Sequence, residues 1–409
     1  MKILDFRLAG TGARSRASAR IVWEDSSRRP FDAYFEGEGI GAPRGIDPNP
    51  FLTAAFIPAL RAGELRVRIE DLPVCPVLVQ GLLSAAALLG SWYGHRNIPK
   101  IEAPAASRPM LPAGPAALFL SGGADSLHLL FQNRSRHPET SEESFRDAIH
   151  FLGMALYEED PGEAARNLAQ RALETTREIA RSSRLTLRSV ASNVAALSGD
   201  HLFWATHTQG AMLASTALGL PIRSASLAAS WDSRKLPPWG SHPSLDPLYS
   251  SSSVQVRHRD DEFTRLEKIR ALADWPLALE NMLVCHEGPL PPGELNCGRC
   301  EKCVRTMTEL LIAGALDRAT AFPVRRVTAE VLDALAPTQL RTERFWGDLP
   351  APLEAAGRKD LAGATRRFLV RTRRQRQWED GRGLKGRLRE IDRIVFGSAV
   401  SRLRRWTLR

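Results

Sequence analysis

The stretch that decides the fold is Ala116-Ala117-Leu118-Phe119-Leu120-Ser121-Gly122-Gly123-Ala124-Asp125-Ser126, an apolar run that ends in a glycine turn. The run predicts a short strand, and the residues after the turn predict a helix. Two adjacent glycines let the backbone bring its N–H groups against an anion, and a helix start adds partial positive charge. We therefore expect the turn to bind a polyphosphate. Ser121 and Ser126 would add hydroxyl groups, and Asp125 would cap the helix or reach a magnesium ion on the phosphates.

The sequence after the turn alternates between apolar runs and longer helical patterns. This alternation is typical of an α/β fold in which helices wrap a parallel sheet. Five strands are expected, at 116–120, 149–157, 185–190, 222–228 and 253–256. The intervening helices are expected at 125–132, 162–181, 204–218 and 262–273.

The six residues of the turn match neither of two common phosphate-binding patterns. A Walker loop needs Lys followed by Ser or Thr after its last glycine, and a dinucleotide fingerprint needs three glycines at other spacings. A strand, Ser-Gly-Gly-x-Asp-Ser and a helix instead resemble the signature of the PP-loop ATP pyrophosphatases, also called the adenine nucleotide alpha-hydrolase-like (HUP) fold. The alternative is a tight turn that merely caps a helix.

The PP-loop resemblance implies a Rossmann-like parallel five-stranded sheet and an enzyme that cleaves ATP between its alpha and beta phosphates, with Mg²⁺. It implies that Asp125 and Ser126 take part in catalysis. The nucleotide-binding residues it implies are Ser121, Gly122, Gly123, Ala124, Asp125 and Ser126.

Four of the five cysteines form a second cluster, at Cys285, Cys297, Cys300 and Cys303. Two overlapping C-x2-C turns bring three sulfurs together, and a fourth thiolate completes a tetrahedron that suits structural Zn²⁺. An iron–sulfur cluster, or buried thiols without a metal, are the alternatives. Clustered free cysteines indicate a reducing compartment, so we expect a cytoplasmic protein.

The combination of the two motifs narrows the resemblance. A PP-loop domain followed by Cys-Gly-x-Cys-x-x-Cys at 297–303 and by Arg305 is similar to the 7-cyano-7-deazaguanine synthase group over about residues 116–316. The similarity implies an AMP- and pyrophosphate-forming ligase that adenylates a small-molecule or protein-borne carboxylate, such as a 7-deazaguanine derivative, and transfers it to nitrogen. The long gap after Cys285, the N-terminal domain and the basic tail depart from that group, so the identity of the substrate stays open.

Two other functions stay open. One is a PP-loop sulfurtransferase that modifies tRNA or a nucleobase. Cys75 is the only cysteine outside the cluster able to carry a persulfide, and its apolar surroundings disfavour a thiolate. The other is a nucleotide-binding module without turnover that recruits a nucleic acid or a protein.

Further candidate residues have plain structural alternatives. Lys268 follows an expected strand and is our candidate for a catalytic cation that neutralises phosphate, although it equally fits an exposed helix face. His242 and Asp246 lie in a proline-bounded loop after the fourth strand, where they would contact substrate or simply belong to the surface. His201 and His207 fit packing or helix capping.

The chain is expected to have four parts, because a proline-rich stretch interrupts it at 104–116. These are an N-terminal α+β domain at 1–103, a linker at 104–116, a PP-loop domain at 117–320 and an Arg-rich helical extension at 321–409. The uncharged stretch 74–94 is about long enough to cross a bilayer, but it is expected to be a buried helix, with no transmembrane span.

The net charge of +10 is concentrated at the C-terminal end. Residues 366–409 hold 15 Lys or Arg against four Asp or Glu, a net of +11. This balance predicts a nucleic acid, an anionic surface or an acidic protein as partner. The residues best placed to contact phosphates and stack on a base are Arg371, Arg373, Arg374, Arg376 and Trp378, although a solvated helix is the alternative.

Overall fold

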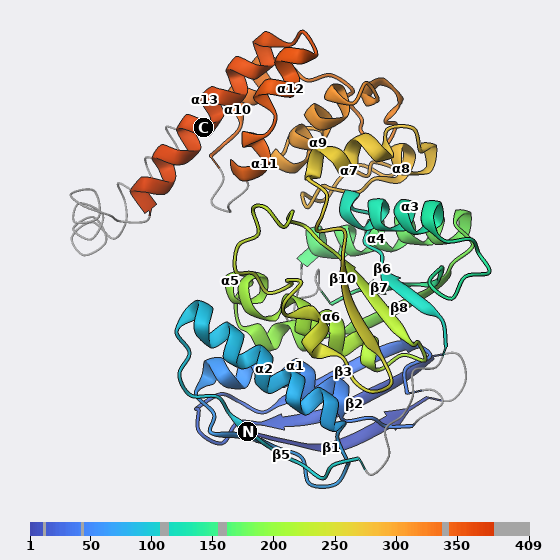
Figure 1. The fold of residues 1–409 in the computed structure, drawn as a ribbon, viewed down its shortest axis with the longest axis vertical. Coiled ribbons are helices and arrows are strands. Elements are labelled where there is room, and N and C mark those ends of the chain that lie inside the picture. Colours follow the sequence, from blue (N-terminus) through green and yellow to red (C-terminus); the bar gives the residue numbers. More distant parts are fainter. Residues whose placement is uncertain (11–13, 42–44, 107–113, 154–161, 338–342, 380–409) are drawn as a thin grey trace. The chain divides into compact units, whose positions relative to one another are not determined.

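The computed structural model describes residues 1–10, 14–41, 45–106, 114–153, 162–337 and 343–379 (Figure 1). Residues 376–379 are described by their backbone alone. The chain forms two compact units, residues 1–264 and 265–409. The expected boundary near residue 104 does not separate compact units. The four-cysteine segment falls in the same unit as the C-terminal helices.

A ten-stranded sheet runs through the first unit in the order β10-β9-β6-β7-β8-β3-β2-β1-β4-β5. Five neighbouring strands are parallel and, numbered along the chain, follow the order 3-2-1-4-5 from β8 to β10. They are β6 (Ala116–Phe119), β7 (Phe145–Phe151), β8 (Thr186–Ser192), β9 (Ser224–Ala228) and β10 (Gln255–Arg259). The mixed α/β class is therefore confirmed, but the sheet has ten strands and not five.

The additional strands come from the N-terminal hundred residues. β3 pairs antiparallel with β8, with Phe35 opposite Ser192 and Gly37 opposite Val190. The N-terminal segment therefore extends the parallel sheet and does not form a sheet of its own. Sequence periodicity does not reveal such pairing, because it does not show which edge a strand will join. The five strands are β1 (Lys2–Ala9), β2 (Arg14–Val22), β3 (Phe31–Glu38), β4 (Arg66–Arg68) and β5 (Lys100–Glu102).

β7 begins four residues before its expected start, because Arg146 and Asp147 hide the beginning of the strand in the sequence. Asp147 is buried and pairs with Arg188 of β8, and His150 is buried with Nδ1 3.2 Å from the carbonyl oxygen of Leu120. Burial raises the pKa of Asp147 although the arginine opposes that shift. Polar partners on adjacent strands thus let a polar segment occupy the interior of the sheet.

Helices cover both faces of the parallel strands (Figure 1). α3 (Ala124–Arg136) and α4 (Gly162–Ser182) pack on one face, and α6 (Gln209–Leu218) packs on the opposite face. This arrangement follows from right-handed crossovers on either side of β6. Between β8 and α6 lie the short elements η1 (Val194–Ser198), α5 (His201–Phe203) and the π-helical η2 (Trp204–Thr208).

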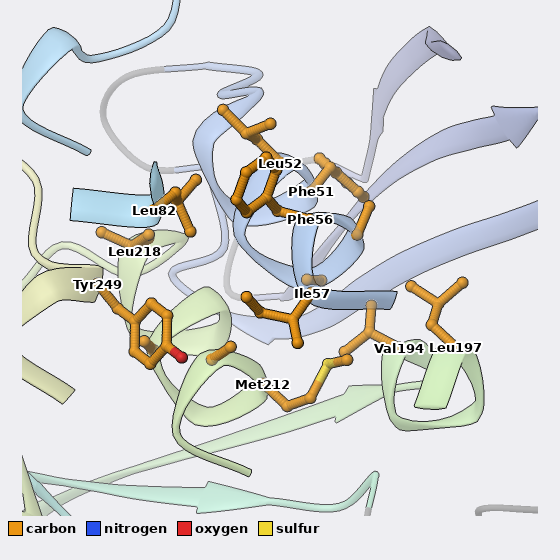
Figure 2. Close-up of a cluster of buried hydrophobic side chains, with 14 of the residues drawn as sticks. Phe51, Leu52, Phe56, Ile57, Leu82, Val194, Leu197, Met212, Leu218 and Tyr249 are labelled. Carbon is orange, nitrogen blue, oxygen red and sulfur yellow. The ribbon is translucent and has the colours of Figure 1, made fainter. Parts of the chain in front are cut away.

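The centre of the hydrophobic core is α1 (Asn49–Ala62), which is buried at every position from 50 to 60 (Figure 2). Figure 2 shows Phe56 and Ile57 of α1 with Met212 of α6 and Tyr249 of η3 (Asp246–Tyr249). A helix that is apolar on all sides must be packed against other elements on all sides. This core joins the N-terminal segment to the parallel strands.

The uncharged stretch 74–94 forms α2 (Pro76–Tyr93), and one face of it is buried. By length and composition it is the one helix in the described residues that could cross a membrane. Its inward residues belong to the same core as α1, which explains the lack of charge on that face without a bilayer. The inward residues are Leu78, Leu82, Ala85, Ala86 and Leu89.

The second unit is helical in its described residues. Its core includes Trp346, which is fully buried with its ring 5.2 Å from that of Phe368. The long helix α13 packs against α10, α11 and α12. The elements are α7 (Arg265–Leu272), α8 (Pro276–Asn281), α9 (Glu301–Ile312), η4 (Leu316–Arg318), α10 (Ala329–Ala334), α11 (Glu343–Gly347), α12 (Pro350–Ala355) and α13 (Lys359–Glu379).

Candidate functional site

The glycine turn connects the end of β6 to the start of α3. Gly122 has a φ of 75°, a left-handed conformation that favours glycine. Gly123 is extended and occupies the N-cap position of α3, where it offers no side chain to cap the helix. The first backbone N–H groups of a 13-residue helix thus lie at a turn that carries no N-cap side chain. This is the local geometry that binds anions at helix N-termini.

The two serines of the turn hold its shape. The Ser126 hydroxyl donates to the carbonyl oxygen of Gly123 at 3.0 Å and accepts from the N–H of Ser121 at 3.3 Å. The Gly123 N–H donates to Ser121 Oγ at 3.3 Å. Ser126 is buried, Ser121 is exposed and Asp125 is half-buried on the first turn of α3. The structure thus gives Ser126 a positioning role inside the turn and leaves Ser121 accessible.

The turn lies at the point where the strand order of the parallel sheet reverses. β6 lies between β7 and β9. The chain continues from β7 to β8 on one side of β6 and from β9 to β10 on the other side. Ligands of open α/β sheets bind at such a switch point, outside the carboxyl ends of the strands. Trp231 and Asp232 follow the carboxyl end of β9 and are buried, and Asp232 accepts a hydrogen bond from Arg234 at 3.0 Å.

A buried histidine–aspartate pair anchors the helix that follows the turn. His128 of α3 donates from Nδ1 to Asp260 at 2.8 Å, and the Gln132 amide donates to His128 Nε2 at 3.2 Å. Asp260 directly follows β10 and has a φ of 66°. Sequence reasoning missed this pair, because its two members lie 132 residues apart and neither belongs to a recognised motif.

Asp246 organises the loop between β9 and β10 and is not exposed to a substrate. It is fully buried, and Oδ2 accepts from Ser241 Oγ and from His258 Nδ1 at 2.7 Å each. The expectation that Asp246 contacts substrate is therefore wrong, because its carboxylate is used within the fold. His242 is half-buried, with its ring 4.7 Å from that of Trp92.

Lys268 belongs to α7 in the second unit and is buried. The glycine turn belongs to the first unit. The catalytic role of Lys268 therefore stays a prediction. The exposed helix face, which was the alternative for this residue, is excluded by its burial.

The four clustered cysteines come together in the second unit. The sulfurs of Cys285, Cys297, Cys300 and Cys303 all lie within 4.8 Å of one another. Cys285 Sγ is 3.9 Å from Cys300 Sγ, and Cys297 Sγ is 3.8 Å from Cys303 Sγ. Such a cluster can hold a metal ion.

Three of the four thiols change one another's pKa. Thiol hydrogen bonds from Cys300 and Cys303 lower the pKa of Cys285. The contact with Cys285 in turn raises the pKa of Cys300 and of Cys303. Several thiolates at this spacing repel one another, so full ionisation of the cluster requires a positive charge among the sulfurs.

Asn296 fixes the backbone next to the cysteine cluster, and sequence reasoning missed it. Its fully buried side chain accepts from the N–H groups of Val284 and Cys285 and donates to the carbonyl oxygens of Met282 and Ala321. One amide side chain thus ties Cys285 to the segment that precedes it and to the turn at Ala321 after η4. The signal in the sequence was an asparagine directly before Cys297, at a position where caps and turns favour Asn.

His286 directly follows Cys285 but does not belong to the group of four sulfurs. It is exposed, and Lys302 Nζ lies 3.1 Å from its ring nitrogens. Arg305, the arginine that follows the cysteines, is buried and donates to Glu301 at 2.9 Å. Glu301 also accepts from Trp346 Nε1 at 2.7 Å, so the turn that carries the cysteines is joined to α11.

The Arg-rich segment is partly used inside the second unit. Arg371 donates to the carbonyl oxygens of Leu332 and Leu335 and pairs with Asp333, which restrains it from contacting phosphates. Arg373 and Arg374 are exposed. The side chains of Arg376 and Trp378, and residues 380–409, lie outside the described residues. Nucleic-acid binding by this segment stays a prediction.

The second unit also contains a cavity of about 650 Å³. Arginine and carboxylate side chains both line it, including Arg326, Arg358, Glu330 and Asp360. Arg358 is already paired with Asp360 at 2.7 Å. The mixed charges do not select one ligand class.

No protein family model matches the chain, and comparisons with curated proteins and with solved structures also give no match. Function must therefore be argued from the residues of this chain.

Proposed function

We propose that the protein is a PP-loop enzyme of the HUP fold that binds ATP at Ser121–Ser126 and releases pyrophosphate and AMP. The observation that carries the proposal is the geometry of the turn: a left-handed Gly122, an N-cap at Gly123 without a side chain, and an accessible Ser121. The position of the turn at the sheet's switch point supports a nucleotide ligand. Asp125, on the first turn of α3, is our candidate for a Mg²⁺ contact.

The reaction that suits this turn is adenylation of a carboxylate. A carboxylate oxygen attacks the alpha phosphorus of ATP, the bond to the beta-phosphate oxygen breaks, and pyrophosphate leaves with its negative charge against the turn. Backbone N–H groups and the N-terminus of α3 stabilise that growing charge, and one preorganised donor of this kind is worth about 2.7–4 kcal/mol. A nitrogen nucleophile then attacks the acyl carbon, and AMP leaves. We propose a 7-deazaguanine-type carboxylate as the first substrate to test.

We infer that the four cysteines hold a single zinc ion with a structural role. Four sulfurs at about 2.3 Å from one ion would lie ~3.8 Å apart, close to the 3.8 and 3.9 Å separations found here. The ligands of an iron–sulfur cluster bind different iron atoms and so spread further apart. Four thiolates leave no open position for water activation.

The geometry gives less support to sulfur transfer. Cys75 is buried at the N-cap of α2, and its sulfur hydrogen-bonds with Ser252 Oγ at 3.4 Å and with the Ser252 N–H at 3.3 Å. A persulfide carrier needs an accessible thiolate, and burial in apolar surroundings disfavours one. Nitrogen transfer is therefore the proposal.

The test uses an ¹⁸O-labelled carboxylate with ATP, Mg²⁺ and ammonium. Attack by the carboxylate oxygen predicts pyrophosphate, AMP that carries one ¹⁸O atom, and an amide product by mass spectrometry. Asp125→Ala should lower the rate about a hundredfold or more with an unchanged circular dichroism spectrum. Ser135→Ala is the matched control, because Ser135 lies exposed at the other end of α3.

Two results would overturn the proposal. Release of ADP and phosphate would show cleavage at the wrong bond. Tight ATP binding without AMP or pyrophosphate from any carboxylate would instead favour a binding module.

A further inference from the structure

Two histidines outside the glycine turn face each other through the same ring atom. His95 follows α2, His207 lies in the π-helical segment η2, and their Nε2 atoms are 3.2 Å apart. The two rings are steeply inclined, at 75°. Residues 112 positions apart thus bring two imidazole nitrogens next to each other.

The hydrogen bonds of His207 fix which of its nitrogens carries the proton. Thr206 Oγ1 donates to the carbonyl oxygen of Leu202 at 2.7 Å, so its one hydrogen is already used. The contact of 2.7 Å between Thr206 Oγ1 and His207 Nδ1 must then be a donation from Nδ1. The neutral ring therefore directs the Nε2 lone pair towards His95. Fixing of the tautomer through the opposite nitrogen is typical of metal-binding histidines.

Packing holds the His207 ring in this orientation. The ring stacks on Phe203 at 4.4 Å and lies 4.0 Å from the ring of Tyr93. Burial lowers the pKa of His207 to about 4 and also lowers the pKa of His95. Both rings are accordingly neutral at physiological pH.

The nearest fixed charge does not prevent a cation from binding. Arg61 contributes to the lowered pKa of both histidines. Its guanidinium pairs with Asp200 at 2.6 Å and donates to the carbonyl oxygen of Ser198 at 2.6 Å. Asp200 thus balances the charge of Arg61.

We propose that His95 and His207 together bind one divalent transition-metal ion of the zinc class. Two nitrogens 3.2 Å apart, each about 2.05 Å from a common ion, subtend about 103° at that ion, close to the tetrahedral angle. Imidazole nitrogens suit zinc, nickel and copper. Two protein ligands leave positions for water or for an oxygen of a bound ligand. A π-helical turn at His207 fits this role, because such turns often occur at functional sites.

The test counts metal ions on the full chain after a single equivalent of zinc has been bound at its cysteine cluster. Isothermal titration with Ni²⁺ should then show one further ion per chain. His95→Gln and His207→Gln should each weaken this binding at least tenfold, because each removes one of two ligands. His201→Gln is the matched control: His201 is exposed in the same helical region, and its loss should change nothing.

A direct N–H···N hydrogen bond between the two rings is the competing explanation. It predicts no further ion in the unmodified chain, and that result would overturn the proposal. Equal nickel binding in His95→Gln and the unmodified chain would also overturn it, by locating the ion elsewhere. His95 lies outside the helices and is half-buried. Nickel binding by His95→Gln therefore tests the proposal even if His207→Gln fails to fold.

Discussion

Glu64 is a fully buried carboxylate that gathers several donors. Its Oε2 lies 2.5 Å from the amino group of Met1 and 2.9 Å from the N–H of Glu24, and the N–H of Asp25 donates at 3.2 Å. Burial alone would raise the pKa of Glu64. The amino group and the two backbone donors outweigh that effect, so its pKa is lowered in the folded chain.

Because its folded pKa is lowered, Glu64 stabilises the fold above the ordinary value of 4.5, and this contribution is lost as the pH falls below that value. Glu64→Gln should cost about 3–5 kcal/mol of unfolding free energy at pH 7, since it removes one member of a buried ion pair. The difference from the unmodified chain should shrink as the pH falls to 3. Urea denaturation across this range measures it, with Glu70→Gln as the exposed control.

A difference in stability that stayed constant from pH 7 to pH 3 would contradict this assignment. It would mean that the charge of Glu64 does not contribute, and that only its packing and hydrogen bonds do.

The contact between α2 and η3 depends on a glycine. A Cβ atom at Gly81 of α2 would lie 1.9 Å from the carbonyl oxygen of Leu248. The backbone of η3 cannot move aside as a flexible side chain can, so α2 and η3 would have to move apart. The uncharged composition of α2 thus serves close packing as well as burial.

Gly81→Ala should destabilise the first unit by about 1–3 kcal/mol, the usual cost of overpacking. Helix propensity alone would predict the opposite, a gain of up to about 1 kcal/mol. Thermal denaturation followed by circular dichroism distinguishes the two. Ser84→Ala, at an exposed position of the same helix, serves as the control and should be neutral or slightly stabilising.

The cysteine cluster and the glycine turn belong to different compact units. Removal of the metal should therefore loosen the second unit and leave the first one folded. In a chain loaded with a single equivalent of zinc, elemental analysis should find that zinc lost on chelation, together with at least tenfold faster hydrogen exchange in 282–312, because structural zinc supplies folding free energy.

Peptides from β6 and β7 are the internal control for this experiment and should keep their protection. Unchanged exchange around the cysteines after zinc has left would contradict a structural role for the metal. Loss of protection in both units would contradict their independence.

The sequence by itself determined the features that depend on neighbours along the chain. The strand–turn–helix at 116–136, the spacing of the four cysteines and the existence of the strands β6 to β10 follow from local periodicity, glycine conformation and short ligand spacings. Each of these features depends on residues that are close together in the sequence, so it can be predicted without the rest of the fold.

The tertiary structure decided what depends on distant partners. Pairing of β3 with β8 merged two expected domains into one sheet. Partners far along the chain account for the buried Asp147, for the pair of His128 and Asp260, and for the facing pair of His95 and His207. A buried polar group is tolerated only where another group meets it, and periodicity does not show which one will.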